Sequence, residues 1–175
     1  KAYEEEGAIR FRMPDDGATG WDDLVRGRID VPNEQLEDVV IVRSDGRATY
    51  NFASPVEDLD DGITHVVRGE DHISNTPKQI QILRALGHEP PLYAHLGSIL
   101  GADGKKFSTR QGTAVHRDDL LDEAERHAAR PIALAALKYA DLSTDRVRDY
   151  IFDWDRMLSF DGNTAPYLQY AHTRI

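Results

Sequence analysis

The chain has 175 residues, of which 40% are hydrophobic and 30% charged, a composition typical of a soluble domain with a core. It contains no cysteine, which excludes disulfides and thiolate zinc sites. Its net charge of -10 argues against a uniformly basic surface, so any nucleic-acid contact should be local. The sequence contains neither an apolar run of transmembrane length nor a signal-peptide pattern, so we expect a cytoplasmic protein without membrane association.

Strands are predicted mainly in the first part of the chain. Residues 14–20 are turn-rich, and residues 21–29 mix apolar and charged residues without a clean period. The Asp45-Gly46 turn between two β-branched runs is a strong hairpin signal. The segments with strand character are 8–13, 39–43, 48–53 and 63–68.

The clearest helix signal begins at Thr76. Thr76 can act as the N-cap, Pro77 suits the first helical position, and Gln79 would complete a capping box. An apolar face continues along the helix, and Gly87 is expected to end it. The residues predicted for that face are Ile80, Leu83 and Leu86.

The later part of the chain is predicted to be mostly helical. A short strand near residues 98–100 precedes a glycine- and lysine-bearing loop, 101–112. A helical pattern starts at Asp118, is interrupted at Pro131, and continues as a second helix over 132–139. A last helix over 167–175 runs into the chain end, which suggests a fragment. This order predicts an α/β domain that continues into a helical appendage.

Arg68 is a candidate ligand-binding residue because it follows a β-branched strand and precedes a charged loop. Ligand sites in α/β proteins lie at the carboxyl ends of strands, and an arginine there can clamp a carboxylate with two parallel hydrogen bonds. The alternative is an ion pair with Glu70 or Asp71. Tyr50 could supply a hydroxyl to the same pocket, or be an ordinary strand tyrosine.

The glycine-flanked loop 101–112 carries two lysines, a serine and an arginine. Such a loop can close over a triphosphate and stabilise charge in phosphoryl or adenylyl transfer, although it lacks the Walker A spacing. The alternative is a basic surface turn. The histidines show no metal-ligand spacing, and the acid pairs Asp15-Asp16, Asp22-Asp23 and Asp60-Asp61 are interpreted as solvated turns.

Residues 8–93 resemble the catalytic domain of the glutamyl-tRNA synthetases. The stretch Val67–Gln79, which contains Arg-Gly-Glu-Asp-His, is the most specific part of this resemblance. In that family the residues matching Tyr50 and Arg68 line the glutamate pocket, and the arginine holds the side-chain carboxylate. His72 borders the same pocket. The other matching stretches are 24–27, 40–46, 49–53, 62–66 and 85–87.

From about residue 95 the chain resembles the arginyl-tRNA synthetases instead. Both families are class I synthetases with the same nucleotide-binding core, so a crossover near Ala94 and His95 would join equivalent places. The change of resemblance therefore suggests a chimera that is recombined, designed or computationally generated. The matching stretches are 105–112, 119–124, 137–143 and 149–171.

The resemblance implies the C-terminal half of a class I, Rossmann-like catalytic domain. Residues 1–115 would form a partial catalytic α/β domain with an inserted hairpin region. Residues 116–175 would form a helical segment that leads toward a truncated anticodon-binding-type bundle. The N-terminal half of the nucleotide-binding fold, with its His-Ile-Gly-His-type signature, is absent, and His95-Leu96-Gly97-Ser98 resembles that signature only by coincidence.

The implied reaction is ATP-dependent activation of glutamate, with Mg²⁺, followed by transfer to tRNA. Lys106, Ser108 and Arg110 would be catalytic, and Lys105, with Lys106 and Ser108, would bind ATP; no structural metal is expected. Thr109 replaces the second lysine of the usual signature loop. Glutamate is favoured over arginine because Arg68 carries a positive charge.

Weak or no activity is expected without the missing ATP-binding half. The alternatives are an arginyl-tRNA synthetase fragment, a non-catalytic tRNA-binding or structural module, and a designed sequence without activity. The oligomeric state is left open.

Overall fold

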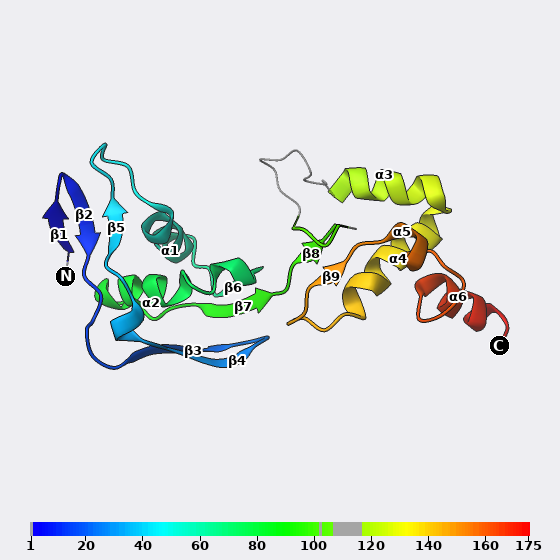
Figure 1. The fold of residues 1–175 in the computed structure, drawn as a ribbon, viewed down its shortest axis with the longest axis horizontal. Helices are drawn as coiled ribbons and strands as arrows, with labels where there is room; N and C mark the ends of the chain where they lie inside the picture. The colour runs from blue at the N-terminus through cyan, green and yellow to red at the C-terminus, as the bar shows by residue number, and fades with distance from the viewer. Residues whose placement is uncertain (1, 102, 107–116) are drawn as a thin grey trace. The chain divides into compact units, whose positions relative to one another are not determined.

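The computed structural model describes residues 2–101, 103–106 and 117–175, which belong to two compact units, Lys1–Leu96 and Gly97–Ile175 (Figure 1). Both units contain strands and helices, so the predicted α/β class is confirmed. The domain boundary predicted between residues 115 and 116 lies outside the described residues. No helix in the described ranges is both long and apolar enough to cross a membrane.

The first unit begins with a three-stranded antiparallel sheet. Its order is β1-β2-β5, and the strands predicted over 8–13 and 39–43 are confirmed as β2 and β5. Phe11, Met13 and Ile41 form an apolar cluster together with Ile82 from a later helix. The strand bounds are Ala2–Glu5 for β1, Ala8–Phe11 for β2 and Val39–Val42 for β5.

An antiparallel ribbon of β3 (Ala18–Asp23) and β4 (Gly27–Pro32) follows the first two strands. The sequence showed no clean period here because the inward face of β3 is mixed. Thr19, Trp21 and Asp23 alternate as its buried side chains, and two of the three are polar. A short 3₁₀ turn, Asn33–Gln35, links the ribbon to β5.

The strand predicted over 48–53 is wrong, because helix α1 (Tyr50–Asp60) begins there. The Asp-Gly turn exists, but strand pairing after it stops at one bridge between Val42 and Ala48. Phe52 packs on the Phe11 cluster, and Pro55 is buried one helical turn later. Phe52 and Pro55 are three residues apart, which is a helical spacing. The β-branched run before the Asp-Gly turn favoured a strand prediction instead.

The parallel pair of β6 (His65–Gly69) and β7 (Leu92–Leu96) is linked by helix α2 (Thr76–Ala85), as Figure 1 shows. The predicted strand and helix are confirmed, whereas β7 was not anticipated. Gly87 has a φ of 85°, which accounts for the helix ending just before it.

Two details of α2 differ from expectation. Asn75 is the N-cap, without a side-chain cap hydrogen bond, and Thr76 instead donates its hydroxyl proton to the carbonyl oxygen of His72. The predicted capping box is therefore wrong. Ile80 and Leu83 are buried as expected, but Leu86 is 48% exposed because the helix has already ended there.

The second unit contains a short parallel strand pair and four helices among its described residues. β8 (Ile99–Leu100) pairs with β9 (Tyr150–Ile151). The backbone passes so close to Gly97 that a Cβ there would lie 2.3 Å from the carbonyl oxygen of Arg148. The helices are α3 (Arg117–His127), α4 (Arg130–Leu142), α5 (Trp154–Met157) and α6 (Ala165–Thr173).

The helices predicted in this unit are confirmed, with shifted boundaries. Pro131 lies in the first turn of α4, where its missing N–H breaks no hydrogen bond, so it begins the helix rather than interrupting one. Thr164 caps α6 by accepting a hydrogen bond from the backbone N–H of Tyr167.

Candidate functional site

The carboxyl ends of β6 and β7 carry the candidate site. The two strands run parallel, and the register places Arg68 of β6 directly opposite His95 of β7. Residues paired in this way project from the same face of a sheet. Arg68 also lies over the ring of Tyr93, with its guanidinium carbon 5.3 Å from the ring centroid. Burial raises the pKa of Tyr93 to about 12, so this ring is a neutral platform for the cation.

Three neutral acceptors hold the Arg68 guanidinium. Nε donates to Nε2 of His95 at 3.2 Å, and Nη2 donates to the hydroxyl of Thr76 at 2.7 Å. Nη1 makes a longer contact of 3.4 Å to the hydroxyl of Tyr50. The expected alternative, an ion pair with Glu70 or Asp71, is not formed. Glu70 pairs instead with Arg26 at 2.6 Å, and Arg68 makes no ion pair within the described ranges.

The structure brings the predicted residues Tyr50, Arg68 and His72 together. Tyr50 is the first residue of α1, and His72 ends the 3₁₀ turn Glu70–His72. The Tyr50 hydroxyl lies 3.2 Å from Nδ1 of His72, and the ring centroids are 5.4 Å apart. Tyr50 is 49% exposed, whereas Arg68 is only partly exposed, so the site is accessible mainly from the side of Tyr50. Their roles in binding stay predictions.

Beneath Arg68 lies a buried pair that the sequence analysis missed, His95 and Asp23. Nδ1 of His95 lies 2.6 Å from Oδ2 of Asp23, and both side chains are fully buried. The other carboxylate oxygen of Asp23 accepts hydrogen bonds from the backbone N–H groups of His95, Val25 and Arg26.

Burial and hydrogen bonding set the charges of this pair. Burial alone would raise the pKa of Asp23, but the hydrogen bonds that its carboxylate accepts lower this pKa to about 2. Burial lowers the pKa of His95, although the Asp23 carboxylate opposes the shift. The arrangement is therefore an ionised carboxylate that accepts from a neutral imidazole.

The interpretation of Asp22-Asp23 as a solvated turn is wrong, because both residues lie on β3 and only Asp22 is exposed. Asp22 is exposed, whereas Asp23 is 4% exposed and points inward from the end of β3. The available signal was the run Leu92–Leu96, an apolar segment with an internal histidine between a proline pair and Gly97. A buried histidine requires a hydrogen-bond partner, and no local residue supplies one.

The residues predicted to bind ATP or to be catalytic either lie in the second unit or lie outside the described residues. Lys105 and Lys106 are exposed after β8, where the backbone N–H of Lys105 donates to Asp103 at 3.0 Å. Ser108 and Arg110 lie outside the described residues. Within the described ranges, no group of three or more His, Asp or Glu side chains is arranged to hold a metal ion.

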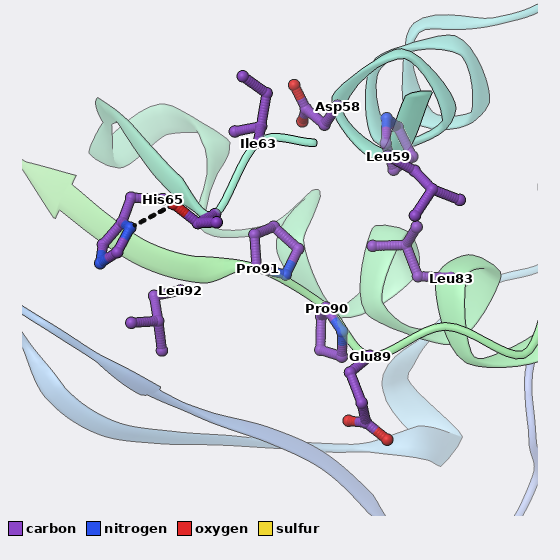
Figure 2. A pocket seen from close by; sticks show the side chains of 11 residues that line it. Asp58, Leu59, Ile63, His65, Leu83, Glu89, Pro90, Pro91 and Leu92 are labelled. Atoms are coloured by element: carbon purple, nitrogen blue, oxygen red, sulfur yellow. Dashed lines mark hydrogen bonds between the residues drawn. The ribbon is translucent and has the colours of Figure 1, made fainter. Parts of the chain in front are cut away.

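A separate pocket of about 360 Å³ lies at the amino ends of β6 and β7 (Figure 2). Its walls combine aliphatic side chains with Pro90 and Pro91, and its polar groups include Asp58 and Glu89. Burial raises the pKa of Asp58, and attraction from Arg68 opposes this shift. The aliphatic side chains are those of Leu59, Ile63, Leu83 and Leu92.

The parallel strand pair places an arginine at its carboxyl ends, where α/β domains commonly bind ligands, and comparison with known proteins identifies the class of the domain. The family described as "tRNA synthetases class I (E and Q), catalytic domain" matches residues 1–140. The chain therefore belongs to the class I tRNA synthetase catalytic-domain family, as the sequence resemblance predicted.

Individual relatives divide between the two resemblances. A glutamate–tRNA ligase of Aromatoleum aromaticum is 61% identical over 107 residues, which are 61% of this chain and 23% of that protein. A crystal structure of a glutamate tRNA ligase from Elizabethkingia meningosepticum, in complex with its amino acid, aligns at 40% identity with a TM-score of 0.55, covering 60% of this chain and 21% of the other.

The putative arginyl-tRNA synthetase of Campylobacter jejuni aligns over more of the chain. It is 26% identical, with a TM-score of 0.62, over 99% of this chain and 35% of its own. The two kinds of relative agree with the predicted glutamyl and arginyl resemblances, whereas a chimeric origin stays a prediction. The chain spans less than a quarter of the length of the curated relatives that it matches.

Proposed function

We propose that this chain contributes the glutamate-binding part of a glutamate–tRNA ligase. The observation that carries the proposal is the state of Arg68, whose hydrogen-bonded guanidinium has no ion-pair partner among the described residues and lies beside the exposed Tyr50. A guanidinium carries five N–H donors, and three hydrogen bonds leave two of them for a ligand. A planar carboxylate is the natural partner of such a pair of donors.

The overall reaction would follow the class I pattern. The α-carboxylate oxygen of glutamate attacks the α-phosphorus of ATP, pyrophosphate leaves, and the glutamyl group then passes from AMP to a tRNA hydroxyl. Arg68 and Tyr50 would hold the side-chain carboxylate of glutamate, with His72 at the border of the pocket. Mg²⁺ would accompany ATP and supply charge neutralisation for its phosphates.

The second unit would provide the phosphate contacts. Lys105 and Lys106 are exposed, which supports a role as cationic partners for ATP. Ser108 and Arg110 complete the proposed set from the sequence resemblance alone. The proposed division is a partial catalytic domain over 1–115, which continues into a helical segment over 116–175.

An arginyl-tRNA synthetase fragment is the second candidate, favoured by the structural likeness over nearly the whole chain. Arginine and glutamate side chains carry opposite charges, so their pockets need opposite partners. The exposed edge described here presents a cation, Arg68, which would repel the guanidinium of arginine. This charge supports glutamate as the ligand of the first unit.

The melting temperature of the chain with a non-hydrolysable glutamyl-adenylate analogue, 5′-O-(L-glutamylsulfamoyl)adenosine, tests the proposal. A ligand that binds only the folded chain stabilises it by about 2.7 kcal/mol at a hundredfold excess over its dissociation constant. We expect a shift with this analogue and none with its arginyl counterpart. Arg68→Ala should abolish the shift, whereas Arg47→Ala, which alters a largely exposed turn arginine, should preserve it.

A shift with the arginyl compound alone, or with neither compound, would overturn glutamate binding. Catalysis is a separate question, because the chain spans so little of its relatives. We expect no ATP–pyrophosphate exchange from the chain alone. Shifts that survive Arg68→Ala would indicate that the ligand binds through other residues, as a non-catalytic module could.

A further inference from the structure

We infer that Asp23 and His95 are positioning residues that orient Arg68 for a carboxylate ligand without neutralising its charge. This inference rests on the proposed function, because it concerns the same Arg68 site. Three elements meet there: Asp23 ends β3, while Arg68 and His95 lie opposite each other on β6 and β7. Neither Asp23 nor His95 needs to touch the ligand, since both side chains are fully buried.

The proton on His95 is placed by Asp23. The 2.6 Å contact between Nδ1 and an ionised carboxylate requires the hydrogen on Nδ1. In a neutral imidazole the other ring nitrogen then has a lone pair and no hydrogen. Nε2 can therefore accept the Nε–H of Arg68, which lies 3.2 Å away. Asp23 thus turns His95 into an acceptor aimed at the arginine.

Two of the three acceptors occupy one edge of the Arg68 guanidinium. Nε and Nη2 lie on the same side of an arginine, and they donate to His95 and Thr76 respectively. The Thr76 hydroxyl lies 3.0 Å from Nε2 of His95 and 3.0 Å from the carbonyl oxygen of His72, and its single hydrogen can be donated to either acceptor. At the remaining edge, Nη2 keeps one further N–H, and Nη1 keeps one besides the N–H that contacts the Tyr50 hydroxyl. That edge is the one that can form a bidentate pair with a carboxylate.

The chemistry of the acceptors preserves the positive charge. A carboxylate in place of His95 would orient Arg68 equally well. It would also neutralise the positive charge that attracts a carboxylate ligand. Here the buried carboxylate of Asp23 is separated from Arg68 by a whole imidazole ring. The carboxylate of Asp23 orients the imidazole of His95, and this neutral imidazole orients the guanidinium of Arg68. Arg68 is therefore oriented before the ligand arrives, which reduces the ordering cost of binding.

Two variants of His95 distinguish its role in orienting Arg68 from the packing of its ring on Tyr93. In His95→Gln, the side-chain carbonyl can reach the place of Nε2 and accept from Arg68. In His95→Asn, the shorter amide can donate to Asp23 but leaves Arg68 Nε–H without its acceptor. Both variants remove the ring that stacks on Tyr93, with centroids 6.0 Å apart, so the packing loss is matched.

Isothermal titration with the glutamyl-adenylate analogue should show weaker binding by about ten- to a hundredfold for His95→Asn, the range of a hydrogen bond to a charged group. For His95→Gln we expect a change of less than about threefold, well below that range. Equal weakening in the two variants would overturn the inference while leaving the proposed function intact. A wild-type chain that does not bind the analogue would overturn both.

A measurement on the unaltered chain keeps the inference testable should the variants not fold. In a ¹⁵N-labelled chain, we expect a scalar coupling across the hydrogen bond between Nε of Arg68 and Nε2 of His95. The same spectra should show His95 with its hydrogen on Nδ1. A hydrogen on Nε2, or an absent coupling with Arg68 Nε–H in rapid solvent exchange, would overturn the inference whatever the ligand does.

Discussion

The two ends of the β6–β7 pair differ sharply in chemistry. At the carboxyl ends, Arg68 and His95 join a hydrogen-bonded network that reaches the buried carboxylate of Asp23. At the amino ends, apolar side chains and two prolines line the pocket of Figure 2, where Asp58 is the partly buried carboxylate. The pKa of Asp23 is lowered, whereas the pKa of Asp58 is raised.

This difference shows how the ends of one strand pair can favour opposite ionisation states of a carboxylate. Burial opposes ionisation at both ends, but only the carboxyl end supplies enough donors to outweigh it. Those donors come from the backbone that follows β3 and from His95 near the carboxyl end of β7. The polar network is therefore a consequence of where the strands end, which is where ligands bind in this class of fold.

Removal of the two carboxylates, one at a time, should give the largest difference in stability between the two ends. Asp23→Ala would leave the Nδ1–H of His95 and several backbone N–H groups buried without an acceptor, so we expect a loss of about 3–5 kcal/mol in the free energy of unfolding. Asp58→Ala should change it by no more than about 1 kcal/mol, because no hydrogen-bond donor among the described residues contacts the Asp58 side chain. Urea denaturation measures both, and similar losses would contradict the distinction.

The sequence predicted the exposed part of the site better than its buried support. Arg68 was recognisable because a β-branched strand leads into it, and the family resemblance added Tyr50 and His72. Tyr50 was placed on a strand, however, and it actually begins α1. Its contact with Arg68 depends on that helix start, which local periodicity did not reveal.

The support was missed because it depends on long-range contacts. Asp23 and His95 are 72 positions apart, so the apolar run around His95 indicates a buried histidine but nothing local identifies Asp23 as its partner. A pair of aspartates on a short segment usually indicates a solvated turn. Only the packing of β3 beside β7 shows that one of them is an internal acceptor. Helices α2 and α6 were predictable because their signals, a proline in the first turn and a glycine or threonine at an end, are local.

The pH dependence of stability should have opposite signs at the two ends. The pKa of Asp23 falls from 3.8 to about 2 on folding, so its contribution is complete above about pH 4 and is lost as the pH falls toward about 2. The contribution amounts to about 2 kcal/mol. The raised pKa of Asp58 acts in reverse, since stability falls as the pH rises through it.

Unfolding free energies across this pH range, for the unaltered chain and for Asp23→Asn and Asp58→Asn, measure each contribution by difference. Asp23→Asn should flatten the acid limb of the profile. Asp58→Asn should instead raise stability near neutral pH relative to acid pH. The same slope of unfolding free energy against pH in all three chains would contradict this prediction, because neither carboxylate would then change its proton affinity on folding.

The smallest expected effect concerns the ligand side of the carboxyl end. Tyr50→Phe removes one hydroxyl, which accepts from Nη1 of Arg68 and can donate to a bound carboxylate, while the ring stays beside His72. We expect binding of the glutamyl-adenylate analogue to weaken by about three- to tenfold, since a single exposed hydrogen bond contributes about 1 kcal/mol. Tyr3→Phe, which removes a hydroxyl that donates to Asp38 instead, should leave binding unchanged. Because Tyr50 is half exposed, its loss should not alter the melting temperature of the free chain, and a variant that melts earlier but binds normally would place this hydroxyl with the buried support rather than with the ligand.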